Sequence, residues 1–445
     1  MSADRPSPWR WREELLAAIT LPRTAEHLPL EQARGRVLAA EVRSPEQVPA
    51  LAVAAMDGFA VRRADLATPG TTTLPVRSEI PARAGEVPPL RPGSAARIMT
   101  GAPVPAGADA VVEVEATDSD PFGPAPETVA LDLESLPAPG RHVRQPGEEI
   151  ALGGLLAEAG DRVGPGLTGL ARTLGLGSVE VLRPLRVALV VTGDELTGDG
   201  PGSAGAGCTA EADGRVATDV PHGAPGAVRE SNGAMLAAAL AADGAHALAT
   251  RRCGDDRDRL RMVLEQAAGE ADLVLTTGGI GQGAFDVVKA LLGERGSGSS
   301  RFAHLALRPG GPQGHGTLPD GVPVVHLPGT PVGALVGYHL FVRPLMVGGG
   351  AAPRRVRLGD GGMTGERRAD GAVRVLPGRL HHDQDGQELV EIVPGSRLAP
   401  YGRADALVLF GADGAGLGGA ERGAGLGGAE RGATDDRRSV LIIPL

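Results

Sequence analysis

The segment Leu273–Lys289 reads LVLTTGGIGQGAFDVVK, an apolar run that passes through a glycine-rich loop into a helical pattern. An apolar run bounded by glycines is typical of a buried parallel strand. The apolar spacing from residue 287 to residue 292 then predicts a helix. Ligands of open α/β sheets bind at the carboxyl ends of such strands, where unpaired backbone N–H groups meet anions. The segment therefore predicts one strand–loop–helix unit that is able to hold an anion.

Units of the same kind surround this segment. Apolar strand patterns and helical patterns alternate along the chain, at 185–196, 229–244, 246–253, 255–268, 272–292 and 322–346. Strands that alternate with helices predict a doubly wound parallel sheet. The glycine- and alanine-rich stretch 198–226 lacks periodicity and is expected to be a flexible loop inside this α/β region.

The regions on either side of this α/β segment have different residue patterns. Residues 12–46 and 149–182 carry helical signals, and the latter include Leu167, Leu170 and Leu174. Residues 47–144 consist of short β-like runs cut by proline and glycine, which predicts a β-rich insertion. The tail from about 348 is again β-like, and a tandem repeat of GAGLGGAER fills 414–431. We expect that repeat to be an expanded hairpin loop.

Composition narrows the class of protein. The 445 residues are enough for two to four domains, and a hydrophobic fraction of 42% with only 2% aromatics predicts cores of Ala, Val and Leu. A net charge of −10 argues against nucleic acid as the main partner. Cys208 and Cys253 are too few for a disulfide framework. No segment is apolar enough to span a membrane and no signal-peptide pattern opens the chain, so we expect a soluble cytoplasmic protein.

Acidic residues follow three of the predicted strands, at Asp194–Glu195, Asp255–Asp256 and Asp286. Parallel strands with right-handed crossovers place such loops along one edge of a sheet. Carboxylates beside glycine loops suit Mg²⁺, which takes few protein oxygens together with phosphate. The alternative for any single acid is a helix cap or a solvated charge, and we assign that alternative to Asp256 and Asp258.

Eight stretches carry a resemblance to a known family: AMDGFAV (55–61), GSAARIMTGAPVPAGADAVVEVE (93–115), VRQPGEEI (143–150), VALVVTGDEL (187–196), ESN (230–232), GDD (254–256), GGIGQGAFDVVK (278–289) and LPGTPVGAL (327–335). Together they resemble the MoeA-type molybdopterin molybdenumtransferases, whose animal relative is the gephyrin E domain. The resemblance follows the family's order from about residue 12 to the C-terminus, and RIMTGAPVPAGADAVV is its most specific segment.

The resemblance implies a multidomain α/β plus β protein. Its parts would be a split helical/β domain (1–46 and 145–182), a β-rich insertion domain (47–144), a doubly wound molybdopterin-binding α/β domain (183–347) and a C-terminal β-barrel (348–445). It also implies a homodimer whose site is shared between chains, and molybdopterin adenylyltransferase as a candidate partner. The implied activity is insertion of molybdate into adenylylated molybdopterin, with Mg²⁺-dependent release of AMP.

The family's site positions map onto this chain residue by residue. The implied catalytic residues are Asp57, Thr100, Glu195, Asp255 and Asp286, and the last three are the implied Mg²⁺ ligands. The implied contacts to pterin, phosphate or molybdate are Arg97, Arg144, Glu149, Thr192, Gly193, Gly278, Gly279, Gly283, Arg308, Gly329 and Thr330. Asp194 is expected to order its loop rather than touch substrate. Molybdate is a dianion, so hydroxyls, backbone N–H groups and cations suit it.

Departures from the family pattern gather in the phosphate cradle. Gly281 and Gly333 stand where the family has serine, and Gly311 stands where it has the second lysine of KPGKP. Thr330 replaces asparagine, and Glu149 replaces aspartate. A lost charge-assisted contact costs roughly 1.5–3 kcal/mol, so weaker phosphate binding is predicted. Because the acids are retained, a working but altered enzyme is favoured. The alternatives are a non-catalytic paralogue that binds molybdopterin or a partner protein, and another adenylyl-transfer or pyrophosphatase activity.

Overall fold

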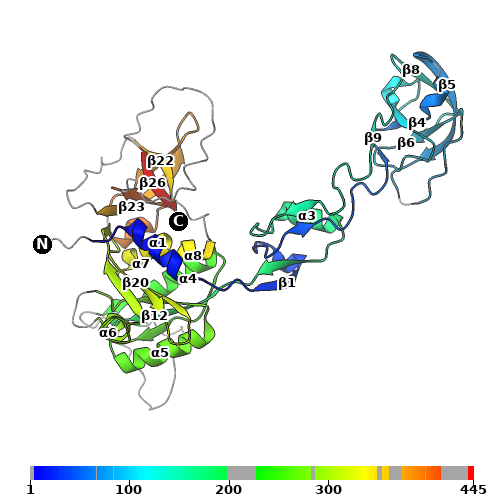
Figure 1. Ribbon diagram of the computed structural model, residues 1–445. Coiled ribbons are helices and arrows are strands. Elements are labelled where there is room, and N and C mark those ends of the chain that lie inside the picture. The colour runs from blue at the N-terminus through cyan, green and yellow to red at the C-terminus, as the bar shows by residue number, and fades with distance from the viewer. Residues whose placement is uncertain are drawn as a thin grey trace. The chain divides into compact units, whose positions relative to one another are not determined.

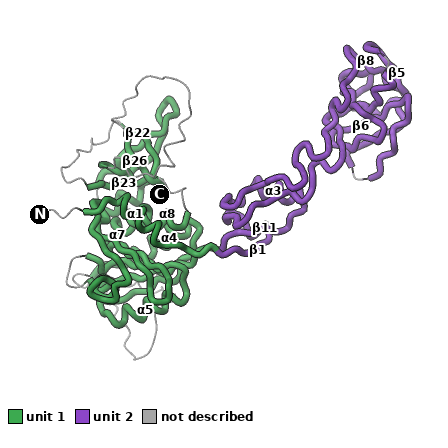
Figure 2. Tube along the Cα trace, in the orientation of Figure 1, with its two compact units in different colours: residues 1–23, 184–445 green, residues 24–183 purple. Residues whose placement is uncertain are grey.

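The computed structural model describes residues 5–66, 68–83, 85–197, 227–281, 286–347, 353–359, 372–395, 397–411 and 439–445. The chain divides into two compact units, Met1–Arg23 with Pro184–Leu445, and Thr24–Arg183 (Figure 2). Three subjects of the sequence predictions lie outside the described residues: the loop 198–226, the repeat 414–431 and Gly283. Among the described residues, no helix is long and apolar enough to cross a membrane.

The first unit is organised by a seven-stranded sheet in the order β15-β12-β17-β21-β20-β18, with β16 also pairing with β12. Its strands are β12 (Arg186–Thr192), β15 (His246–Ala247), β16 (Arg251–Cys253), β17 (Leu273–Thr277), β18 (Ser300–His304), β20 (Pro312–Thr317) and β21 (Pro323–Leu327). The strands from β15 to β21 are parallel, as predicted, whereas β20 and β18 add an antiparallel edge. A further parallel pair joins β13 (Leu196–Thr197) to β14 (Val228–Arg229).

Helices cover both faces of this sheet, because successive strand residues point to opposite sides. On one face Val187 and Leu189 of β12 pack with α4 (Asn232–Ala242) and α7 (Pro331–Gly337). On the other, Ala188 and Val190 pack with α5 (Arg257–Glu270) and α6 (Val287–Leu292). Figure 1 shows α5 and α6 on the side of the sheet opposite α7. The predicted doubly wound α/β domain is confirmed.

The C-terminal region forms a closed β-barrel of five strands, in the order β23-β24-β22-β26-β25 with β25 returning to β23. The strands are β22 (Arg354–Leu358), β23 (Val373–His382), β24 (Glu388–Ile392), β25 (Ala406–Phe410) and β26 (Ser439–Pro444), with α9 (Leu398–Tyr401) before β25 and β19 (Leu307–Arg308) paired to β23. Ala406 and Val408 point into the barrel, while Leu407 points towards the α/β domain. This predicted barrel is confirmed.

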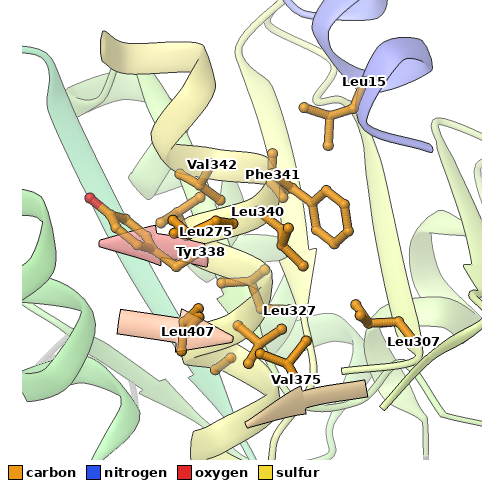
Figure 3. Packing of buried hydrophobic residues seen from close by; sticks show 14 of the residues in the cluster. Leu15, Leu275, Leu307, Leu327, Tyr338, Leu340, Phe341, Val342, Val375 and Leu407 are labelled. Carbon is orange, nitrogen blue, oxygen red and sulfur yellow. The ribbon is translucent and has the colours of Figure 1, made fainter. Parts of the chain in front are cut away.

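The barrel and the α/β domain share one apolar core. After α7 the chain continues through a π-helical turn, η3 (Tyr338–Val342), and α8 (Arg343–Val347). Figure 3 shows Leu407 and Val375 of the barrel close to Leu327 of β21 and Leu340 of η3. All four side chains are at most 1% exposed. This continuous burial makes the α/β domain and the barrel one compact unit.

The N-terminal helix belongs to this unit as well. The helix α1 (Pro8–Ala18) begins at the cap residue Ser7 and buries Trp11 and Leu15 in the shared core. The sequence had grouped residues 1–46 with 145–182 as one domain, whereas the compact units divide between residues 23 and 24. That grouping was implied by the family resemblance, and the long-range contacts of Trp11 and Leu15 are what place the helix in the first unit.

The prediction of helix over 12–46 is wrong beyond α1. The chain there forms β1 (Ala25–Pro29), α2 (Leu30–Ala33) and β2 (Val42–Arg43). β1 pairs with β11 (Ser178–Leu182), and β2 pairs with β10 (Leu155–Ala157). Gly35 has φ +76°, a left-handed conformation that ends the helical path. Helical periodicity was overridden by strand partners more than a hundred residues away. The predicted helix around residues 167–174 is confirmed as α3 (Pro165–Thr173).

The predicted β-rich insertion is confirmed. Its five-stranded sheet has the order β7-β4-β6-β5-β8. The elements are β3 (Val53–Ala54), β4 (Gly58–Val61), η1 (Arg63–Asp65), β5 (Gly70–Ile80), β6 (Ala95–Ile98), β7 (Ala110–Glu113), η2 (Val114–Ala116), β8 (Thr128–Leu133) and β9 (Val143–Arg144). Phe59 and Val112 pack on one face, and Ala60 and Ile98 on the other. The exact division of the chain into four domains stays a prediction.

Candidate functional site

The loop after β12 is shaped by its glycine. Thr192 is buried, and its hydroxyl donates to the Thr277 carbonyl of the neighbouring strand β17 (3.2 Å). Gly193 has φ +144°, and its N–H donates to the Cys253 carbonyl at the end of β16 (3.2 Å). A Cβ at position 193 would lie 2.7 Å from Glu195 Oε2. The glycine therefore leaves room for the Glu195 carboxylate to turn back over the strand end.

Asp194 orders the two neighbouring acidic loops, as predicted. Its Oδ1 accepts the backbone N–H of Asp255 (3.0 Å). A Cβ at Gly254 would lie 2.4 Å from the same oxygen, so the contact requires glycine there. The structure also confirms the two alternative assignments: Asp256 caps α5 by accepting the Arg259 N–H, and the exposed Asp258 pairs with an arginine on its own helix.

Four carboxylates gather at this edge of the sheet, and we refer to Asp194, Glu195, Asp255 and Asp286 as the acidic cluster. Burial, followed by the charges of Asp194, Glu195 and Asp286, raises the pKa of Asp255 above its usual range. Glu195 and Asp286 are thus close enough to Asp255 to act on it electrostatically. Among the described residues no three His, Cys, Asp or Glu side chains converge into a preformed metal cage. Mg²⁺ commonly keeps several waters and substrate phosphates, so a loose carboxylate group with excess negative charge fits it.

Asp286 has a different role from a simple helix cap. It lies at the first position before α6, yet its side chain makes no capping bond to that helix. Its Oδ1 instead accepts the N–H of Gly281 (2.8 Å), which fastens the glycine loop to the start of α6. Lys289 Nζ donates to the Gly281 carbonyl from the other side (3.3 Å). A carboxylate and an ammonium therefore hold the two peptide groups on either side of the Gly281 Cα.

The ends of the three central strands lie in tight contact. Gly278 has φ +90°, and a Cβ there would lie 2.7 Å from the Thr192 carbonyl oxygen. Gly329, in the loop after β21, would place a Cβ 3.2 Å from Gly278 Cα. Gly279 is left-handed as well, with φ +63°. These close approaches bring Thr192, Gly278 and Gly329 together and leave little room for a side chain at either glycine.

Two of the predicted gaps in the phosphate cradle are filled by neighbours. A Cβ at Gly333 would lie 2.6 Å from Thr330 Oγ1, so Thr330 already occupies the space that a serine at 333 would need. A Cβ at Gly311 would lie 2.7 Å from His304 Nε2. Gly281 differs, because a Cβ there would lie 3.3 Å from the Asp286 carboxylate. Of the three positions, 281 has the least severe contact, and the Asp286 carboxylate would have to move by only a few tenths of an ångström.

Asp57 and Thr100 lie in the second unit and are brought together there. Thr100 donates both its N–H (2.6 Å) and its hydroxyl (2.7 Å) to Asp57 Oδ1. These bonds, with a smaller contribution from the charge of Arg97, lower the pKa of Asp57. Asp57 directly precedes Gly58, where a Cβ would lie 2.0 Å from the Val112 carbonyl. The glycine fixes the strand so closely that the exposed Asp57 carboxylate has a defined position.

The other predicted residues of the second unit have unequal surroundings. Arg97 is 4% exposed and donates to the carbonyls of Gly123 (2.6 Å) and Pro121 (3.0 Å). These bonds support a loop, so the assignment of Arg97 as a molybdate ligand stays a prediction that its geometry does not favour. Arg144 on β9 and Glu149 are exposed, and neither makes a side-chain ion pair within the described part of the chain.

Two family models match the chain: the MoeA N-terminal region (domain I and II) over residues 10–175, and the probable molybdopterin binding domain over residues 188–347. The chain is 40% identical over 324 residues to molybdopterin molybdenumtransferase 2 of Mycobacterium tuberculosis, a match that covers 71% of this chain and 73% of that protein. The chain belongs to the molybdopterin molybdenumtransferase family. This confirms the predicted family, its enzymatic class and its place in molybdenum cofactor biosynthesis.

This chain is also similar to other members of the molybdopterin molybdenumtransferase family. The Haemophilus influenzae enzyme is 30% identical, over 75% of each chain. The crystal structure of the molybdopterin biosynthesis MoeA protein from Pyrococcus horikoshii superposes with a TM-score of 0.68 at 25% identity, covering 91% of this chain and 95% of that one. The similarity therefore extends through both compact units and the C-terminal barrel.

Two polar side chains near the predicted site residues were not among the residues that the sequence predicted for the site. Asn232 is 5% exposed, and its Nδ2 donates to the Gly329 carbonyl (2.8 Å), while its Oδ1 has no partner within the described residues. Asn232 lies in the ESN stretch of the resemblance but was not among the implied contacts. At the start of α4 it is Glu230 whose Oε1 accepts the Gly233 N–H. His304 belongs to none of the sequence motifs, and only its position beside Gly311 in the folded chain draws attention to it.

Proposed function

We propose that this protein inserts molybdate into adenylylated molybdopterin, with Mg²⁺-dependent release of AMP. The acidic cluster is the observation that carries the proposal. Glu195, Asp255 and Asp286 follow three different strands of the sheet, and burial together with the charges of its acidic neighbours raises the pKa of Asp255. A protein stabilises such mutual repulsion poorly by itself, and a bound cation relieves it. The neighbouring glycine loops would offer backbone N–H groups to a phosphate beside that cation.

The three carboxylates would hold Mg²⁺, which supplies the Lewis acidity that neutralises charge on a phosphoanhydride. The chain's own part is positional. Asp194 holds the Asp255 loop in place, and the bond from Gly281 fixes the orientation of Asp286. Both acids are thereby presented at one edge before substrate arrives, which lowers the entropy lost on binding.

Binding of the anionic substrates is assigned to the glycine loops and to Arg308. Arg308 lies at the exposed end of β19, and its planar guanidinium is suited to bidentate contact with a phosphate or molybdate. The loops that contain Gly279 and Gly329 would offer backbone N–H groups to these anions, and Gly278 lets its loop pack closely against Thr192. The dithiolene sulfurs that bind molybdenum belong to the pterin, so the proposal needs no cysteine ligand from the protein.

The proposal includes a homodimer in which Asp57 and Thr100 of one chain complete the site of the other. Asp57 is exposed, ionised and held rigid by Thr100, yet it lies in a different compact unit from the acidic cluster. Molybdopterin adenylyltransferase, which would supply the adenylylated substrate, remains the candidate partner. Mixing Asp57→Ala chains with Asp286→Ala chains should restore part of the activity in heterodimers. Heterodimers that form but recover no activity would refute the shared site.

Complementation tests the activity itself. The gene is placed in a strain that lacks its own molybdenumtransferase, and nitrate reductase activity is scored at low molybdate. Wild type should restore it, and Glu195→Gln should not. Rescue by neither, with both proteins folded and expressed, would favour a non-catalytic paralogue. The filled positions beside Gly311 and Gly333 are the observation on which that second candidate rests.

A further inference from the structure

The space beside Gly311 is occupied by an imidazole. β18 ends at His304, whose register partner on β20 is Pro312. A Cβ at Gly311 would lie 2.7 Å from His304 Nε2 and 3.1 to 3.3 Å from two carbons of the same ring. The Gly311 carbonyl also accepts the N–H of Leu305 (2.7 Å), which fixes the two strands at this point. The ring therefore fills the position that any side chain at 311 would take.

His304 is half-buried among basic groups. Neither ring nitrogen makes a hydrogen bond or ion pair within the described part of the chain. Burial lowers the pKa of His304, and the charges of Arg5, Arg308 and Lys289 lower it further. These bases come from the N-terminal segment, from β19 and from α6. Three bases around an imidazole with unused nitrogens make a place where an anion would be attracted from several sides.

We propose that His304 is the second cation of the oxyanion subsite that contains Arg308, and that it binds a tetrahedral dianion in its protonated form. It would take the role that a basic side chain at position 311 would otherwise have, from the opposite strand. The ligand chemistry is a phosphomonoester or molybdate, both of which present several acceptor oxygens to N–H donors. The inference rests on the proposed function and adds one binding residue to that same site.

A protonation-dependent cation gives binding a pH signature. A dianion beside the imidazole stabilises its charged form, so its pKa rises on binding. The contribution of His304 is then complete below the free-protein pKa and is lost as the pH rises through the pKa of the complex. A lysine at 311 would give no such dependence, because its usual pKa is about 10.4.

Calorimetric titration tests this at about pH 5 and about pH 8, because the free-protein pKa of His304 lies below the usual histidine value of about 6.5. Molybdate and molybdopterin are titrated separately into wild type, His304→Gln and Arg308→Gln, with thermal melts to confirm folding. Ligand protonation affects both proteins equally, so its effect cancels in the ratio of wild-type to His304→Gln affinity. We expect that ratio to be roughly 10-fold or more at the lower pH, as for a hydrogen bond to a charged group, and near unity at the higher pH. Arg308→Gln should weaken binding at both.

The two ligands identify the occupant. A His304 effect on molybdate assigns the subsite to molybdate, and an effect confined to molybdopterin assigns it to the terminal phosphate. A ratio near unity at both pH values for both ligands, with Arg308→Gln still weakened, would overturn the inference and leave the proposed function standing. Failure of wild type to bind either ligand would overturn both.

A charge-swap variant supplies an independent measurement. His304→Gly with Gly311→Lys vacates the space and returns a cation from the other strand. Position 311 lies outside the left-handed region, so lysine is not strained there. This double variant should bind the dianion at both pH values with no pH dependence. Gly311→Lys alone should bind less well than the double variant, because the new side chain meets His304. Equal binding by the single and double variants would contradict the shared position.

Discussion

Asp255→Asn replaces one carboxylate of the acidic cluster by a neutral amide of nearly the same shape. The Asp255 side chain accepts no hydrogen bond from the described residues, and its N–H bond to Asp194 is a backbone contact that the amide preserves. The substitution therefore breaks no hydrogen bond of the Asp255 side chain, and it removes the repulsion between Asp255 and three neighbouring acids. We therefore expect the substitution to stabilise the metal-free protein while it abolishes activity.

The expected gain in stability of Asp255→Asn can be estimated from the surroundings of the acidic cluster. Like charges on partly exposed side chains repel by about 0.3 kcal/mol per pair once solvent screening is included. Three pairs give about 1 kcal/mol, which corresponds to a rise in melting temperature of about 2 °C for a unit of this size. The gain should shrink at high salt, where the Debye length falls to about 3 Å at 1 M.

Scanning calorimetry of the first compact unit measures this, with Asp258→Asn as the matched control, because Asp258 is exposed on α5 outside the cluster. Burial and neighbouring acids raise the folded pKa of Asp255, so its ionisation costs stability once the pH rises through that pKa. The gain should vanish below about pH 3.9, the ordinary pKa of Asp. Millimolar Mg²⁺ should stabilise wild type more than the variant. An unchanged or lowered melting temperature for Asp255→Asn at neutral pH would refute the repulsion argument.

Three further predictions concern the same residues. Glu195→Ala and Asp286→Ala should both abolish activity in the complementation assay, but calorimetry should show a loss of roughly 1–2 kcal/mol only for Asp286, whose carboxylate accepts a loop N–H; equal losses would contradict this. Gly333→Ser should lower the melting temperature, and Gly333→Ser with Thr330→Ala should recover it, because a Cβ at 333 meets Thr330 Oγ1 at 2.6 Å. Asp57→Asn should remove stability that wild type holds at neutral pH and loses as the pH falls through its lowered folded pKa; a difference that persists in strong acid would show a cause other than ionisation.

The arrangement of the α/β domain could be predicted from local pattern. Alternating apolar runs and helical spacings specify strands and crossover helices, and parallel strands all present their following loops at one edge. That is why Glu195, Asp255 and Asp286 could be expected together although 91 residues separate the first from the last. Local pattern does not show which distant segment a strand will pair with. For that reason the sequence prediction missed the antiparallel edge strands β18 and β20 and wrongly extended a helix through β1.

Only tertiary structure decided how each functional group is held. Asp286 fastens the Gly281 loop instead of capping α6, and Trp11 joins the N-terminal helix to the first compact unit. His304 lies against Gly311, a pairing that no local motif encodes. Residue types and spacing along the chain determine which elements form and which edge carries the acids. The contacts of a single side chain depend on neighbours brought from distant segments, and those are known only when the chain is folded.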